Sequence, residues 1–128
     1  MSINSSIVRG VRRISLYFHT TENAINALKK LIDDKLISPE DFPEAVIKYR
    51  VGFLPDAEPD NPHYFPLKFY DKRGTQEIWV SSVNAGYRGT GPHGTLEALK
   101  LMGFELTNNE KEEIFTNKNI NLQLLKRR

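Results

Sequence analysis

Short stretches in which apolar and polar residues alternate are the feature that most limits the folds open to this chain of 128 residues. A period of two is typical of a strand with one buried face. The pattern predicts strands at residues 11–18, 45–53, 65–69, 78–83 and 120–124. A charged turn at residues 71–74, ending in Gly74, joins the third and fourth of these as a hairpin. We therefore expect a mainly antiparallel sheet of about five strands.

Other stretches show helical spacing and predict two or three helices beside this sheet. Apolar residues recur every three or four positions over residues 22–33, behind the candidate caps Thr20 and Thr21. A second helix follows a glycine-rich stretch and is expected to stop at Gly103. Thr107 to Glu110 has the spacing of a capping box, which indicates a short third helix. Together these patterns predict a single small α+β domain over residues 1–128.

Composition excludes several classes of function. The chain has no cysteine, which rules out disulfides and thiolate metal sites. Its three histidines show no helical ligand spacing, so we expect neither a metal site nor a cofactor. It has no apolar run of membrane-spanning length and no signal-peptide pattern, so we expect a cytoplasmic protein. The net charge of +2 is too small to indicate nucleic-acid binding, unless the basic residues near both ends meet.

The strongest functional signal is the concentration of glycine between Gly86 and Gly94, just before the second helix. Residues 89–94 match the letters G-x-G-x-x-G between a strand and a helix, as in a dinucleotide-binding loop. Too few residues follow for a doubly wound parallel sheet, and no Gly-Lys-Ser/Thr sequence is present. Both of those named folds are therefore rejected.

The physical argument for an anion site at this helix start does not depend on either of those folds. The first N–H groups of a helix point outward with the positive end of its dipole, and we expect Pro92 at the first helical position. Phosphates bind at such helix starts, where glycines allow a close approach. The predicted ligand-binding residues are Asn84, Tyr87, Arg88, Gly89, Thr90, Gly91, His93, Gly94 and Thr95. Arg88 would bind phosphate through two hydrogen bonds, while Asn84 and Tyr87 would lie near a base or sugar.

These patterns leave several hypotheses open. The first is non-catalytic binding of a small phosphorylated, nucleotide-like ligand, as in a sensor or a sequestering sponge. The second is a protein-interaction module of the immunity or inhibitor type, which would use the acidic, proline-rich residues 54–63 and an aromatic hairpin formed by Tyr64, Phe65, Phe69 and Tyr70. The third is an enzyme acting on a phosphorylated substrate with His93 as general acid or base. The glycines are also open to a purely structural explanation, and a homo-oligomer is compatible with so small a chain.

Overall fold

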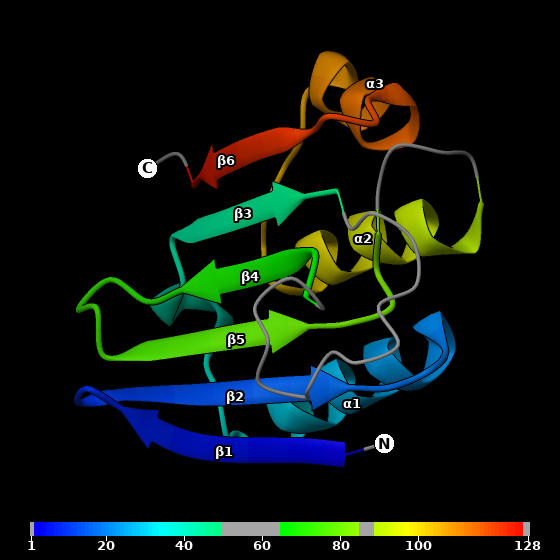
Figure 1. Cartoon of the computed structure of the whole chain (residues 1–128). Coiled ribbons are helices and arrows are strands. Elements are labelled where there is room, and N and C mark those ends of the chain that lie inside the picture. Colours follow the sequence, from blue (N-terminus) through cyan, green and yellow to red (C-terminus); the bar gives the residue numbers. More distant parts are fainter. Residues whose placement is uncertain (1, 50–64, 85–88, 127–128) are drawn as a thin grey trace.

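The alternating stretches form one six-stranded sheet, and helices pack on one of its faces (Figure 1). The computed structural model describes residues 2–49, 65–84 and 89–126. In chain order the elements are β1 (Ser2–Val8), β2 (Val11–Tyr17), α1 (Thr21–Asp33), the 3-10 helix η1 (Pro39–Asp41), β3 (Glu44–Lys48), β4 (Leu67–Tyr70), β5 (Gln76–Val80), α2 (Thr90–Leu101), α3 (Asn108–Thr116) and β6 (Asn121–Leu125). The predicted α+β class and mainly antiparallel sheet are confirmed.

The sheet contains one parallel pair among antiparallel ones. Its strand order is β1-β2-β5-β4-β3-β6. β2 and β5 run parallel, with Ile14 opposite Ile78, whereas every other neighbouring pair is antiparallel. The predicted hairpin corresponds to β4 and β5. The parallel pair places β2 and β5 side by side in the sheet, although more than fifty residues of chain separate them.

One strand, β1, was absent from the sequence prediction. Its residues Ser2–Val8 carry no clear apolar face, and the side chains described in it are all exposed. The strand forms because Arg9 and Gly10 make a two-residue turn, with φ values of 53° and 80°. Positive φ at both central residues is the geometry that folds a tight hairpin. Turn geometry, rather than burial, therefore positions β1 against β2.

Alternation along the strands divides the side chains between two faces. The core lies between the sheet and the helices, where Leu16, Phe69 and Val80 are fully buried beneath residues such as Leu28 and Leu99. On the opposite face, Phe65 and Trp79 form a smaller buried cluster with Tyr17 packed against it. Strand β3 ends at Lys48, and the rest of that predicted strand falls mostly on residues 50–53, outside the described part of the chain.

The end of α2 confirms the predicted stop signal. Gly103 has a φ of 86°, in the left-handed region. Its N–H donates to the carbonyl of Lys100 at 3.0 Å, and the N–H of Phe104 donates to the carbonyl of Leu99 at 2.9 Å. This is the paired hydrogen bonding of a Schellman motif.

The left-handed backbone at this position gives a first testable prediction. Gly103→Ala is expected to lower the free energy of unfolding by about 1 kcal/mol, because a Cβ is strained at this φ. The added Cβ itself would meet only Lys126, with its Nζ at 3.4 Å, so steric overlap adds little. Urea denaturation measures the loss. Gly103→Asn is the matched control and should lose less, and equal losses in the two variants would contradict the backbone explanation.

Candidate functional site

The two parallel strands bring the starts of α1 and α2 to the same end of the sheet, where the carboxyl ends of β2 and β5 lie (Figure 1). Strand β2 is followed by α1, and β5 is followed by α2. Because parallel strands end on the same side, both helices begin there. In open α/β sheets, ligands bind outside the carboxyl ends of parallel strands. Residues 89–94, the described part of the glycine-rich stretch, lie at the local equivalent of that position.

Side-chain hydroxyls connect the ends of the two parallel strands. The Ser81 hydroxyl oxygen accepts the N–H of Phe18 at 2.8 Å and lies 3.0 Å from the carbonyl oxygens of Leu16 and Phe18. The Thr21 hydroxyl donates to the carbonyl of Ser82 at 2.6 Å. These contacts satisfy backbone groups where both strands stop, and so hold the two helix starts together. The sequence analysis missed them because the partners are more than sixty residues apart.

Among the described residues, no N-cap side chain is hydrogen-bonded at the start of α2. Its N-cap is Gly89, in an extended conformation with a φ of 169°. The N–H of His93 donates to the Gly89 carbonyl at 3.2 Å, so the N–H groups of Thr90 and Gly91 have no partner within the helix. Pro92, which has no N–H, is the third residue of α2, so the prediction that it occupies the first helical position is wrong. The two amides of the first turn that lack an intrahelical partner are therefore those of Thr90, which is exposed, and Gly91, which is buried.

The other two α-helices begin differently. The Thr20 hydroxyl caps α1 by accepting the N–H of Asn23 at 3.1 Å, and Glu22 lies in the first turn. Helix α3 has a full capping box between Thr107 and Glu110, as predicted. Helix α2 has no acidic residue in its first turn. Its positive end is thus not neutralised by a carboxylate of that turn.

Gly94 and Thr95, two of the predicted ligand-binding residues, are buried. A Cβ at Gly94 would lie 2.1 Å from Cγ2 of Thr21 and 3.3 Å from Cγ1 of Val83. Gly94 therefore allows α2 to approach α1. Thr95 is fully buried, and its hydroxyl lies 2.7 Å from the carbonyl of Asn84 and 3.2 Å from that of Gly91. These two residues fix the position of the helix start and do not face solvent.

The remaining predicted residues differ in their exposure. Thr90 and His93 are exposed at the start of α2, and the His93 ring makes an edge contact with Phe115 at 4.8 Å between centroids. Gly89 and Asn84 are partly exposed, whereas Gly91 is buried. Tyr87 and Arg88 lie outside the described residues. The structure thus brings Thr90, Gly91 and His93 together on one helical turn.

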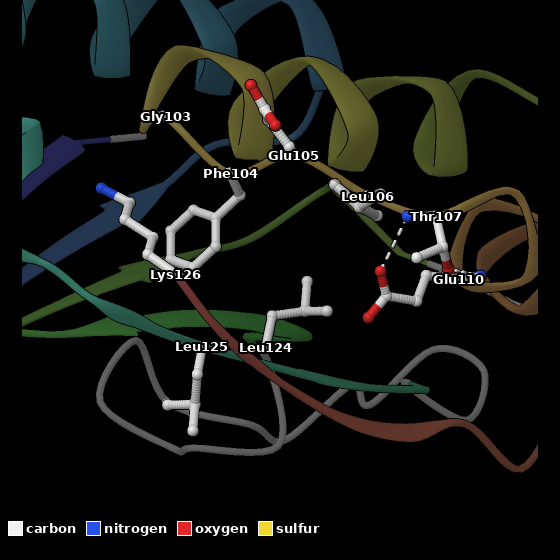
Figure 2. Close-up of a pocket in the computed structure, with 9 residues that line it drawn as sticks. All are labelled: Gly103, Phe104, Glu105, Leu106, Thr107, Glu110, Leu124, Leu125 and Lys126. Carbon is white, nitrogen blue, oxygen red and sulfur yellow. Dashed lines mark hydrogen bonds between the residues drawn. The ribbon is translucent and has the colours of Figure 1, made fainter. Parts of the chain in front are cut away.

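The described residues also line two cavities, neither of which is lined by the first turn of α2. The larger, of about 450 Å³, lies between the α2–α3 linker and β6 (Figure 2). The Lys126 side chain runs beside the Phe104 ring, and its Nζ donates to the carbonyl of Pro39 at 2.8 Å. Burial lowers the pKa of Lys126, against the opposing effect of Glu40. Glu110 accepts the N–H of Thr107 as part of the α3 capping box. Lys126 and Glu110 are therefore both engaged in hydrogen bonds within the protein.

The aromatic hairpin proposed as an interaction surface is largely buried. Phe69 belongs to the core, and Phe65 packs against Trp79 at 5.4 Å between ring centroids. The Arg13 guanidinium lies over the Trp79 ring at 3.7 Å, with Lys68 at 4.8 Å. Burial lowers the pKa of Lys68, as do Lys48 and Arg13, while Glu77 acts in the opposite direction. The other parts of that hypothesis, Tyr64 and residues 54–63, lie outside the described residues.

Among the described residues, the basic side chains near the two ends of the chain lie apart. Arg9 lies in the β1–β2 turn, and Lys126 follows β6. Strands β1 and β6 form opposite edges of the sheet. Arg9 and Lys126 therefore do not contribute to one phosphate-binding patch.

No family model, curated protein or solved structure matches this chain. Within the described residues, no group of three or more histidine, cysteine, aspartate or glutamate side chains is placed to hold a metal ion. Among the helices that the structure describes, none has the length and apolar character needed to cross a membrane.

Proposed function

We propose that the start of α2 binds a small phosphorylated, nucleotide-like ligand without chemical conversion, as a sensor or a sequestering protein would. The observation that carries the proposal is a helix N-terminus with neither a side-chain cap nor an acidic residue in its first turn. The N–H groups of Thr90 and Gly91 would donate to phosphate oxygens, and the Thr90 hydroxyl and His93 would add donors at the rim.

The position of this helix start supports the proposal. It lies at the end of a parallel strand pair, and the hydroxyls of Ser81 and Thr21 hold the surrounding backbone in place. A donor set that is already ordered loses little conformational entropy when it binds an anion. Gly94 and Thr95 contribute indirectly, because they fix α2 against α1 and against the end of β5.

Thermal melting against a panel of nucleotides tests the proposal directly. A ligand that binds only the folded state stabilises it, by about 2.7 kcal/mol at a hundredfold excess over Kd. A nucleotide should therefore raise the Tm, and the matching unphosphorylated nucleoside should not. Mass spectrometry of the protein–nucleotide mixture after incubation should recover the nucleotide intact. Absence of any shift at millimolar nucleotide would contradict binding, and a converted product would contradict the non-catalytic role.

Thr90→Glu separates the anion site from general stability. Thr90 is the exposed first residue of α2, so a carboxylate there should interact favourably with the helix dipole. The variant should therefore be more stable than wild type by about 0.3–1 kcal/mol without ligand. It should also lose the nucleotide-induced rise in Tm, because the glutamate carboxylate would occupy the proposed phosphate position and repel the phosphate.

Thr90→Gln is the matched control for this substitution. It has a similar size without the charge, so it should retain most of the nucleotide response. If Thr90→Glu responds to nucleotide as strongly as Thr90→Gln, the ligand does not bind at the start of α2.

A further inference from the structure

The outer edge of β1 is an exposed strand without the features that usually prevent edge pairing. Every described side chain from Ile3 to Gly10 is exposed, and Ile3 and Ile7 retain 42% and 77% of their accessible surface. Strand Ser2–Val8 contains no charged residue and no proline. Soluble proteins commonly place lysine, proline or a bulge on such an edge to block association with another chain.

The hydrogen-bonding pattern shows which backbone groups face outward. Residues Ile3, Ser5 and Ile7 lie opposite Leu16, Ile14 and Arg12 of β2. The N–H of Arg12 donates to Thr75, and the carbonyl of Leu16 accepts from Ser81, so both groups point away from β1. Antiparallel pairs alternate between bonded and non-bonded, which makes these the non-bonded pairs. The N–H and carbonyl groups of Ile3, Ser5 and Ile7 are therefore directed out of the sheet edge.

The sequence of this edge is complementary to itself. If two copies pair antiparallel about Ser5, Ile3 of one copy lies opposite Ile7 of the other, and Ser5 lies opposite its own equivalent. Isoleucine then meets isoleucine on the helix-covered side of the sheet, where Leu36 is also 58% exposed. This register pairs Ile3, Ser5 and Ile7 with one another, and these are the residues whose backbone groups point out of the sheet edge. Each pair can therefore exchange main-chain hydrogen bonds.

We propose that a second copy of this chain is the partner of this edge. Two sheets join through β1 across a two-fold axis at Ser5, in a closed and isologous contact. The other sheet edge, β6, is a poorer candidate because the α2–α3 linker lies alongside it and lines a cavity with it. The dimer is independent of the proposed ligand, since β1 is the edge strand and the start of α2 follows β5.

Ser5→Pro tests the proposal in the full-length chain. The Ser5 N–H points outward, so proline removes a donor of the dimer and no hydrogen bond of the β1–β2 hairpin. Sedimentation velocity should show wild type at twice the monomer mass of 14.7 kDa and Ser5→Pro at the monomer mass. Ser5→Ala is the matched control, which keeps the N–H and should remain dimeric. A monomeric wild type at every concentration, or a dimeric Ser5→Pro, would overturn the proposal.

A charge-reversal pair tests the register without relying on proline. Ser5→Lys and Ser5→Glu each place two like charges opposite each other at the two-fold axis, and each should raise the dimer Kd by about fivefold. Mixing the two variants should lower the Kd again through a heterodimer with opposite charges. Mixtures no tighter than the separate variants would show that residue 5 does not face its equivalent, and so would overturn this register.

Discussion

Gly94→Ala is expected to lower the free energy of unfolding by about 2 kcal/mol, although alanine favours helices. The added Cβ would lie 2.1 Å from Cγ2 of Thr21, which is closer than any two carbon atoms can pack. Thr21 cannot turn away freely, because its hydroxyl donates to the Ser82 carbonyl at 2.6 Å. Overpacking of this kind costs roughly 1–3 kcal/mol, against a helix-propensity gain of about 0.5–1 kcal/mol. Urea denaturation would measure the net loss.

The Thr21→Ser background isolates the cause of that loss. Serine lacks Cγ2 but retains the hydroxyl that bonds to Ser82. In this background Gly94→Ala is expected to be close to neutral, because the helix-propensity gain offsets the remaining tight contact of 3.3 Å with Val83. A double-mutant cycle should therefore give a coupling energy of roughly 2 kcal/mol between residues 21 and 94. Equal losses in both backgrounds would mean that Gly94 is required for some reason other than contact with Thr21.

Ser81→Ala is the second substitution with a large expected effect, a loss of about 1–3 kcal/mol in the free energy of unfolding. Ser81 is buried, and its hydroxyl oxygen accepts the N–H of Phe18 at the end of β2. Alanine leaves that donor without its partner and also removes the contacts with the carbonyls of Leu16 and Phe18. The Phe18 N–H is partly buried, and a donor shielded from water that loses its partner costs more than the net value of one hydrogen bond. Thermal and urea unfolding would both report the change.

Ser82→Ala provides the comparison at the neighbouring position. The Ser82 hydroxyl also donates to the Phe18 carbonyl, but Ser82 is only partly buried. Its φ of 60° is equally strained for serine and alanine, so backbone conformation does not distinguish the two variants. We expect a clearly smaller loss than for Ser81→Ala. If Ser82→Ala lowers the free energy of unfolding more than Ser81→Ala does, the connection between the ends of the parallel strands depends on Ser82 and not on Ser81.

These two predictions also bear on the proposed ligand site, because both substitutions act on the scaffold beneath it. A Gly94→Ala protein that remains folded should bind nucleotide more weakly only if the start of α2 has moved. Its Thr21→Ser partner should then restore binding together with stability. Restored stability without restored binding would indicate that Gly94 contacts the ligand directly.

Features that depend on neighbours in sequence were predictable. The capping box from Thr107 to Glu110 and the stop at Gly103 were confirmed, because each is made within a few residues of chain. Each predicted strand overlaps an observed one, from β2 to β6, with shorter or shifted bounds, and the apolar spacing of α1 was confirmed, because burial of one face imposes a fixed period. The glycine-rich stretch likewise predicted a helix start, and α2 does begin there.

The sequence by itself thus determined the class of fold and the place of the candidate site, since periodicity, caps and turns are local. Only the tertiary structure decided that β2 lies parallel to β5, and that Gly94 and Thr95 are buried while Thr90 and His93 face solvent. The physical reason is the same in each case. These outcomes depend on contacts between segments far apart in the chain, and one sequence alone does not state which segments meet.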